Sequence, residues 1–263
     1  MIVAILFVLG ICFGSFVNAL VWRVHKKKDW VKARSQCESC GHELSTLDLI
    51  PLLSWLSLKG RCRYCKKAIH WSAPLLELIL AAVFVISYVF WPVTMAGGQW
   101  VLFITWLTAS IGLLALAVYD LCWMLLPSKI LYPTFLAAIT GRLAYILFFA
   151  QNKAHSFELL ALSLLVASGI FWLIYELSRG RAIGFGDVRL GLITGTLLAD
   201  PFKSLLMIFL ASLLGTFYVL PALLLRKKNI GARLPYGPFL ITAVFIVILF
   251  GDRLIDWYKN LVI

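Results

Sequence analysis

The chain has 263 residues, of which 62% are hydrophobic and 14% charged, and its mean hydropathy is +0.94. Soluble domains carry about 25% charged residues, so this composition excludes a soluble enzyme and a disordered chain. The apolar residues fall into runs near the roughly 20 residues that span a bilayer core as a helix, which also excludes an outer-membrane barrel. The sequence therefore predicts an all-α polytopic membrane protein.

Eight apolar runs predict eight membrane-spanning helices. Their expected ranges are residues 1–22, 74–93, 100–120, 129–149, 157–177, 188–199, 202–225 and 237–251. The sixth run is short, and it fits a half-span, a span extended by its neighbours or a helix that begins inside the membrane. The first run has basic residues after it and none before it, which is the reverse of a cleaved signal peptide. We expect it to be retained, with the N-terminus outside.

The basic residues follow the alternation that eight spans predict. With the N-terminus outside, residues 23–73, 120–129, 178–189 and 226–236 lie in the cytosol, and they hold 19 of the 24 Lys and Arg residues. Cytosolic loops of membrane proteins carry such an excess, which supports both the orientation and the number of spans. Without the sixth span, the basic run Arg226 to Lys228 would lie outside. The net charge of +12 therefore indicates contact with the lipid bilayer and not with nucleic acid.

The long polar segment, residues 23–73, is too short to build a core that is stable by itself. It contains two C-x-x-C pairs with 21 residues between them, formed by Cys37, Cys40, Cys62 and Cys65. Two such pairs can hold one tetrahedral Zn²⁺, and thiols stay reduced in the cytosol, so we expect a zinc-ribbon-like cytosolic loop. Four free cysteines or a redox pair is the alternative. Four protein ligands leave no open position, so this zinc would be structural.

Four acidic residues lie in or beside predicted spans, where an isolated carboxylate is costly. They are Glu77, Asp120, Glu176 and Asp187. Glu176 has two arginines nearby and suits an interfacial ion pair. Asp120 and Asp187 are separated by two complete spans, so both lie at the cytosolic edge of the membrane. Two acids are thus available to one site.

An aspartic hydrolase uses a pair of aspartates to activate water. Like charges a few ångströms apart do not both ionise readily, so one carboxyl keeps its proton while the other removes a proton from water. Gly184 and Gly186 precede Asp187, and glycines allow close approach of a substrate backbone and unusual dihedral angles. The alternative is that Asp187 caps a helix, but the presence of Asp120 at the same edge favours catalysis.

The ordered set of motifs resembles the prepilin peptidases, or type IV leader peptidases, a branch of the G-x-G-D membrane aspartic proteases. The resembling segments, which cover nearly the whole chain, are Gly14 to Asn18, the two C-x-x-C pairs, Ile50 to Leu56, Gly60 to Cys62, Pro74 to Leu78, Asp120 with Leu125 to Pro127, Gly184 to Asp187, and Pro235 to Phe239. One departure is Ser128, where the family often has an acid.

The resemblance implies a catalytic pair, Asp120 and Asp187, with an active-site loop. The implied reaction removes the short basic leader of a type IV prepilin or pseudopilin, after a glycine, at the cytoplasmic face of the bacterial inner membrane. Members with a cysteine-bearing first loop also methylate the new N-terminus with S-adenosylmethionine. The matches at Gly60 and Glu77 imply that this chain does so and that both residues belong to the methyl-donor site. The alternative for Glu77 is an ion pair with a Lys or Arg of the loop.

We therefore expect three parts: residues 1–22 as the first helix, 23–73 as the cytosolic zinc loop associated with methylation, and 74–263 as the membrane peptidase domain. One alternative is another G-x-G-D membrane protease without methylation, although such families lack the four-cysteine loop. A second is a zinc-stabilised membrane scaffold or transporter. A transporter, however, should place its acids deep in the bilayer on paired broken helices.

Overall fold

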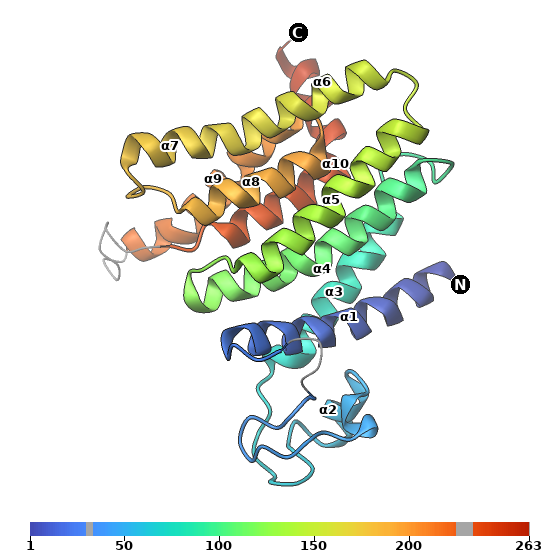
Figure 1. Cartoon of the computed structure of the whole chain (residues 1–263), viewed down its shortest axis with the longest axis vertical. Helices are drawn as coiled ribbons and strands as arrows, with labels where there is room; N and C mark the ends of the chain where they lie inside the picture. The colour runs from blue at the N-terminus through green and yellow to red at the C-terminus, as the bar shows by residue number, and fades with distance from the viewer. Residues whose placement is uncertain (30–33, 225–233, 263) are drawn as a thin grey trace. The chain divides into compact units, whose positions relative to one another are not determined.

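The computed structural model describes residues 1–29, 34–224 and 234–262, and Figure 1 shows that helices make up nearly all of their regular structure. The extended contacts within these ranges are two isolated bridges, Gln36 with Glu43 and Arg61 with Ala68. The all-α prediction is confirmed. The contacts divide the chain into two compact units, Met1–Val89 and Phe90–Ile263.

Unit 1 is a pair of long helices with an irregular loop between them. It contains α1 (Ile2–His25), a 3-10 turn η1 (Thr46–Leu49), the short α2 (Leu53–Ser57) and α3 (Ser72–Val89). A Cβ added to Gly10 would lie 2.4 Å from the Cα of Ala81, and one added to Gly14 would lie 2.5 Å from the Cα of Glu77. These two glycines therefore let the backbones of α1 and α3 touch. For this reason α3 groups with the first helix, whereas a domain boundary was expected before it, at residue 74.

Unit 2 is a bundle of the remaining helices. They are α4 (Gln99–Trp123), α5 (Ser128–Phe148), α6 (Lys153–Leu164), the π-helical turn η2 (Leu165–Gly169), α7 (Ile170–Ser178), α8 (Phe185–Leu198), α9 (Pro201–Leu224) and α10 (Gly237–Val262). In the described part of the chain, seven helices are long and apolar enough to cross a membrane, with Lys153–Ser178 counted as one. The basic run Arg226 to Lys228 lies outside the described residues.

Helix α8 is the short sixth run of the sequence. Its 14 residues are about 21 Å long, which is less than the roughly 30 Å of a bilayer core. Most of its residues from Val188 onward are buried, because other helices of unit 2 surround it. Gly191 and Gly195 allow a close approach to Ala167 in the π-helical turn, whose carbonyl oxygen would lie 2.5 Å from a Cβ at Gly191. The sixth run is thus a separate short helix, Phe185–Leu198, which its neighbours enclose and do not extend.

Two arginine side chains show how α8 lies along α5. At the start of both helices, Arg189 Nη1 donates to Ser128 Oγ at 3.1 Å. Toward the other end, Arg142 Nε donates to the Thr196 carbonyl at 3.1 Å, and its guanidinium also donates to the Leu197 carbonyl. The cation meets the negative end of the α8 dipole, which explains an arginine inside a membrane helix. The two helices run in the same direction, so both begin at one end of the bundle.

Candidate active site and metal-binding loop

Asp120 lies one turn before the end of α4, which ends as Met124 adopts a left-handed conformation (φ 52°). Its side chain is buried, and Oδ2 accepts a hydrogen bond from the Gly237 N–H at 3.1 Å. Gly237 is the first residue of α10, where backbone N–H groups have no partner within the helix. A Cβ at this position would lie 2.7 Å from Oδ2. Gly237 therefore both binds the carboxyl group and leaves room for it.

Asp187 lies in the first turn of α8, which has Gly184 as its N-cap. The Asp187 N–H donates to the Gly184 carbonyl at 3.0 Å, and the carboxyl group accepts a hydrogen bond from the Gly184 N–H. It also lies close enough to Asp120 for the two carboxyl groups to interact electrostatically. The structure thus brings together the two aspartates that the sequence singled out, from the end of α4 and the start of α8.

The two glycines before Asp187 have different surroundings. Gly184 has φ −79° and ψ 147°, which any residue adopts, and Gly186 does not have a positive φ. The expectation of unusual dihedral angles was therefore wrong. A Cβ at Gly186 would lie 2.9 Å from Leu126 Cδ1, so this glycine lets the segment after α4 pack on α8. A Cβ at Gly184 would meet Asp187 Oδ2 at 3.5 Å, which is an ordinary van der Waals contact.

Tyr236 is a neighbour of the aspartates that sequence reasoning did not place in the site. Its hydroxyl lies 3.3 Å from Ser212 Oγ, and its ring meets the ring of Phe171 edge to face. Burial, which is the largest cause, and the negative charge of Asp187 raise the pKa of Tyr236, against a smaller opposite effect of the Ser212 hydrogen bond. The signal was the segment Pro235 to Phe239, whose prolines also suit a simple helix entry.

We predict that Gly237→Ala lowers the hydrolase activity expected of the aspartate pair by roughly 10²-fold, because the added methyl group displaces the Asp120 carboxyl group. The matched control is Gly215→Ala, since a Cβ at Gly215 meets its nearest neighbour, the Phe239 ring, at 3.8 Å. Hydrolysis rates of the two variants measure the effect, with thermal unfolding of both as the test of folding. Equal rates for the two variants would show that the Gly237 contact does not position Asp120.

The four predicted cysteine ligands form a cluster in unit 1. The sulfur atoms of Cys37, Cys40, Cys62 and Cys65 all lie within 4.8 Å of one another. Tetrahedral coordination with metal–sulfur bonds of about 2.3 Å separates two sulfurs by about 3.8 Å, and the Cys37 and Cys65 sulfurs are 3.9 Å apart. His42 instead stacks on Tyr64, with ring centroids 3.7 Å apart. The four thiols therefore fit a single structural metal ion.

Both C-x-x-C pairs lie on turns of the same kind. The Cys37 N–H donates to the His42 carbonyl at 2.9 Å, and the Gly41 N–H donates back to the Cys37 carbonyl at 2.9 Å. The turn at Cys62 repeats both bonds, and Lys66 takes the place of Gly41. Gly41 and Lys66 have φ values of +72° and +59°, which the tight turn requires. Two such turns that present their thiols to each other are what a zinc-ribbon-like loop needs.

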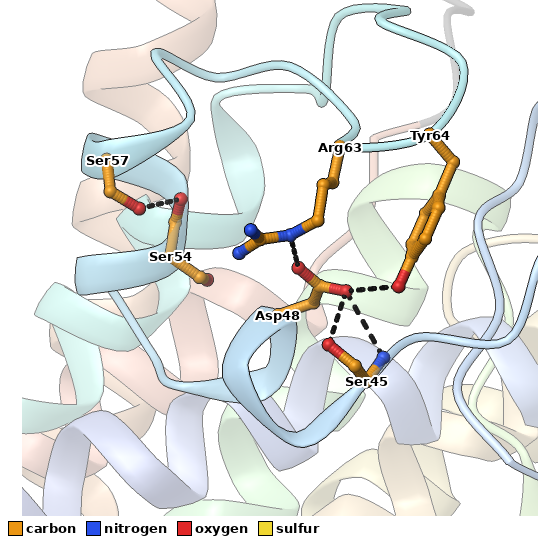
Figure 2. A network of polar contacts seen from close by, with 6 residues as sticks. All are labelled: Ser45, Asp48, Ser54, Ser57, Arg63 and Tyr64. Carbon is orange, nitrogen blue, oxygen red and sulfur yellow. Dashed lines mark hydrogen bonds and ion pairs between the residues drawn. The ribbon is translucent and has the colours of Figure 1, made fainter.

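Asp48 links η1 to the second cysteine turn, as Figure 2 shows. Its Oδ1 accepts a hydrogen bond from Arg63 Nε at 2.7 Å, and its Oδ2 accepts from Tyr64 Oη at 3.1 Å and from Ser45 Oγ at 2.8 Å. Only 4% of the Asp48 side chain is exposed. Burial disfavours the charged carboxylate, but the hydrogen bonds from Arg63 and Ser45 outweigh it and lower the pKa of Asp48 to about 2. Asp48 therefore holds the loop together as an anion.

We predict that Asp48→Asn reduces the apparent metal affinity of the loop roughly tenfold, since metal binding and loop folding are coupled. Because the folded pKa lies below that of a free aspartate, the stabilisation is complete above about pH 4 and is lost as the pH falls toward 2. Chelator competition at pH 7 measures the full effect. Glu43→Gln is the control, because its ion pair with Arg34 is exposed and should contribute little. Equal losses in the two variants would contradict a special role for Asp48.

A cavity of about 350 Å³ lies in unit 1, between α1, the cysteine loop and the start of α3. Glu77, which the resemblance connects with the methyl donor, lines this cavity and accepts a hydrogen bond from the Leu52 N–H at 2.7 Å. Gly60, the second such residue, is not part of the cavity wall. A Cβ at Gly60 would lie 2.9 Å from the ring of Trp55, and it is Trp55 that lines the cavity.

These features define a polytopic α-helical membrane protein with a close pair of aspartates and a metal-binding cysteine loop. The family model for the bacterial peptidase A24 N-terminal domain matches residues 8–91, and the model for the type IV leader peptidase family matches residues 107–220. The chain therefore belongs to the type IV leader peptidase, or prepilin leader peptidase, family, and it is an enzyme of that family.

Curated relatives agree with this assignment over the whole chain. Proteins named prepilin leader peptidase/N-methyltransferase from Pseudomonas aeruginosa, Aeromonas salmonicida and Bacillus subtilis are 31%, 29% and 28% identical to it. The alignments cover 95%, 99% and 97% of this chain and 91%, 94% and 97% of the relatives, in the same order. No solved structure matches the chain significantly.

Proposed function

We propose that this enzyme removes the basic leader of type IV prepilins or pseudopilins with Asp120 and Asp187, and then methylates the new N-terminus. The observation that carries the peptidase proposal is the pair of carboxyl groups that interact electrostatically, one of which, Asp120, is bound by the first N–H of α10. The relatives named as prepilin leader peptidases support the substrate class.

The chemistry of the proposed pair follows from the proximity of two carboxyl groups. One carboxyl keeps its proton, because two like charges at short distance are unfavourable, and the other is charged. The charged aspartate removes a proton from water, and the resulting hydroxide attacks the carbonyl carbon of the glycine that ends the leader. The protonated aspartate donates to the developing oxyanion, and a proton then passes to the leaving amine as the C–N bond breaks.

The methyl-transfer proposal rests on the cavity of unit 1 and on the names of the relatives. S-adenosylmethionine supplies an electrophilic methyl group on a sulfonium centre. It carries an adenine, a carboxylate and two positive centres, and the cavity wall offers the complementary chemistry. Its basic side chains include Arg63 and Lys67, and its acidic side chains include Asp48 and Glu77. Of the two residues that the resemblance implied, we propose that Glu77 contacts the donor. Gly60 does not line the cavity, and we propose that it affects the donor site without contacting the donor.

We propose Zn²⁺ as the ion of the cysteine cluster, since four thiolates at tetrahedral spacing are its usual structural site. The cluster shares the cavity wall, because Cys37 and Cys62 line the cavity. The metal would therefore maintain the shape of the methyl-donor site without taking part in either reaction.

We further propose that the protein lies in the bacterial cytoplasmic membrane with its N-terminus on the outer side. Both aspartates and the cysteine loop then lie on the cytosolic side. The distribution of Lys and Arg supports this orientation. The parallel course of α5 and α8 supports one common face for the two aspartates.

Mass spectrometry of a prepilin incubated with the purified enzyme tests the proposed function. We expect loss of the leader in every reaction, and an additional methyl group on the new N-terminus only when S-adenosylmethionine is present. Leader loss without methylation would reject the methyl-transfer proposal. No cleavage of several candidate prepilins and pseudopilins would reject the peptidase proposal for this chain.

A further inference from the structure

Arg142 carries a positive charge inside the membrane-spanning helix α5, and among the described residues no carboxylate lies within ion-pair distance of it. Its Nε and Nη2 donate to the Thr196 and Leu197 carbonyls, whereas Nη1 has no hydrogen-bond partner in the described part of the chain. The buried side-chain atoms without a partner include no atom of Arg142, so Nη1 has accessible surface. An unpaired charge at membrane depth is costly, and this cation is therefore available to an anion.

Arg142 lines a cavity of about 170 Å³ that lies entirely within unit 2. The wall comes from the ends of α5 and α8, the starts of α4 and α9, and the second half of α10. The cavity reaches the surface, because Pro92 and Val93 line it and are exposed. Small-molecule pockets usually measure roughly 300–1,000 Å³, so this one suits a small charged group and not a cofactor.

The cavity wall has an excess of one positive charge. Its charged side chains are Arg142, Lys203 and Asp252. Lys203 Nζ pairs with Asp252 Oδ1 at 2.7 Å, which leaves the charge of Arg142 uncompensated. Gln99 also lines the cavity, and its Oε1 accepts a hydrogen bond from Trp91 Nε1 at 3.3 Å, so its amide N–H groups are a further source of donors. The wall thus offers a charged donor and a neutral donor to an anion.

This cavity lies at the end of the bundle opposite to the aspartates. Helix α8 has Asp187 in its first turn and ends with Leu198 in the cavity wall, so the two residues are about 17 Å apart along the helix. Helix α4 runs the other way, with Gln99 at its start and Asp120 near its end. The cavity is therefore separate from the candidate peptidase site. Tryptophan is enriched at membrane–water interfaces, and Trp91 in the wall fits such a position.

We infer that this cavity binds a phosphate group, carried either by the headgroup of a membrane phospholipid or by free inorganic phosphate. A guanidinium group binds phosphate oxygens through charge-assisted hydrogen bonds. The phosphodiester of a phospholipid carries one negative charge, which matches the excess charge of the wall. Bound phosphate would also reinforce the packing of α5 on α8, because the same guanidinium binds the last carbonyls of α8. The inference does not depend on the proposed peptidase or methyl-transfer reactions.

Native mass spectrometry of the delipidated full chain in a non-ionic detergent tests the inference. The three probes are dioctanoyl phosphatidylglycerol, dioctanoylglycerol, which has the same acyl chains without the phosphate, and inorganic phosphate. We expect one phosphatidylglycerol per chain and no comparable binding of dioctanoylglycerol. Binding of the phospholipid but not of inorganic phosphate would identify the headgroup as the source. Inorganic phosphate that binds as tightly as the phospholipid, and displaces it, would identify the free ion. Equal binding of dioctanoylglycerol and phosphatidylglycerol would overturn the inference.

Arg142→Gln should weaken binding of the phosphate-bearing probe at least roughly tenfold, because it removes the charged donor. The matched control is Lys153→Gln, which removes an exposed positive charge at the start of α6, outside the cavity, and should bind like the wild type. Thermal unfolding of both variants shows whether they remain folded. A folded Arg142→Gln protein with wild-type affinity would overturn the inference.

A second pair of variants leaves Arg142 in place, since this residue also binds α8. Val93 is 48% exposed at the rim of the cavity, so a polar residue there should not disturb the fold. Val93→Glu adds a negative charge and should weaken phosphate binding roughly tenfold, whereas Val93→Gln has the same size without the charge and should bind like the wild type. Equal affinities of the two Val93 variants would contradict an anion site in this cavity.

Discussion

Asp120→Asn and Asp187→Asn should each reduce leader cleavage by at least about 10³-fold while the protein still folds. An amide can neither remove a proton from water nor supply one of suitable acidity, and in the proposed mechanism the two carboxyl groups act as one unit. In the Asp120→Asn variant, the side-chain amide oxygen would still accept the hydrogen bond from the Gly237 N–H, so the local structure should persist. Timed mass spectrometry of a prepilin substrate measures the loss.

Glu176→Gln is the matched control for this experiment. It makes the same chemical change in an acid of α7 whose side chain is exposed, and the structure records no ion pair for it among the described residues. Its cleavage rate should equal that of the wild type, and all three variants should retain the wild-type melting temperature and metal content. An Asp187→Asn enzyme that processes leaders at the normal rate would refute the catalytic pair.

Cys62→Ser should reduce the bound metal from one equivalent per chain to nearly none. Cys62 is the most buried of the four cluster cysteines, with 4% of its surface exposed, and a serine hydroxyl does not replace a thiolate ligand. Structural zinc contributes roughly 10–16 kcal/mol to folding in zinc-finger peptides, and a loop of this size has no core to compensate for its loss. We therefore expect the loop to unfold and methylation to be abolished.

The two activities should respond differently, because the aspartates lie in unit 2 and the cluster lies in unit 1. Leader cleavage by the Cys62→Ser enzyme should fall much less than methylation. Elemental analysis by mass spectrometry identifies the metal, and parallel assays give both rates. The control is Cys12→Ala, since Cys12 is exposed on α1 and lies outside the cluster. A Cys62→Ser enzyme with full metal content and normal methylation would contradict the structural role.

The sequence alone was enough for those features that depend on local pattern. Long apolar runs predicted the membrane helices, because burial in a bilayer is decided by the summed hydropathy of about 20 neighbouring residues. The spacing of Cys37, Cys40, Cys62 and Cys65 predicted the metal cluster, because a C-x-x-C turn brings two thiols together by itself. The number of spans between Asp120 and Asp187 predicted that they share a face, because each crossing reverses the side of the membrane.

The tertiary structure decided the features that depend on which helices touch. Hydropathy could not show that residues 188–199 form a short enclosed helix, because burial among helices and burial in lipid give the same apolar run. Nor could it show that α3 packs on α1 through Gly10 and Gly14. The Gly237 N–H on Asp120 joins residues 117 positions apart. Such contacts arise from packing between segments, and no local sequence pattern encodes them.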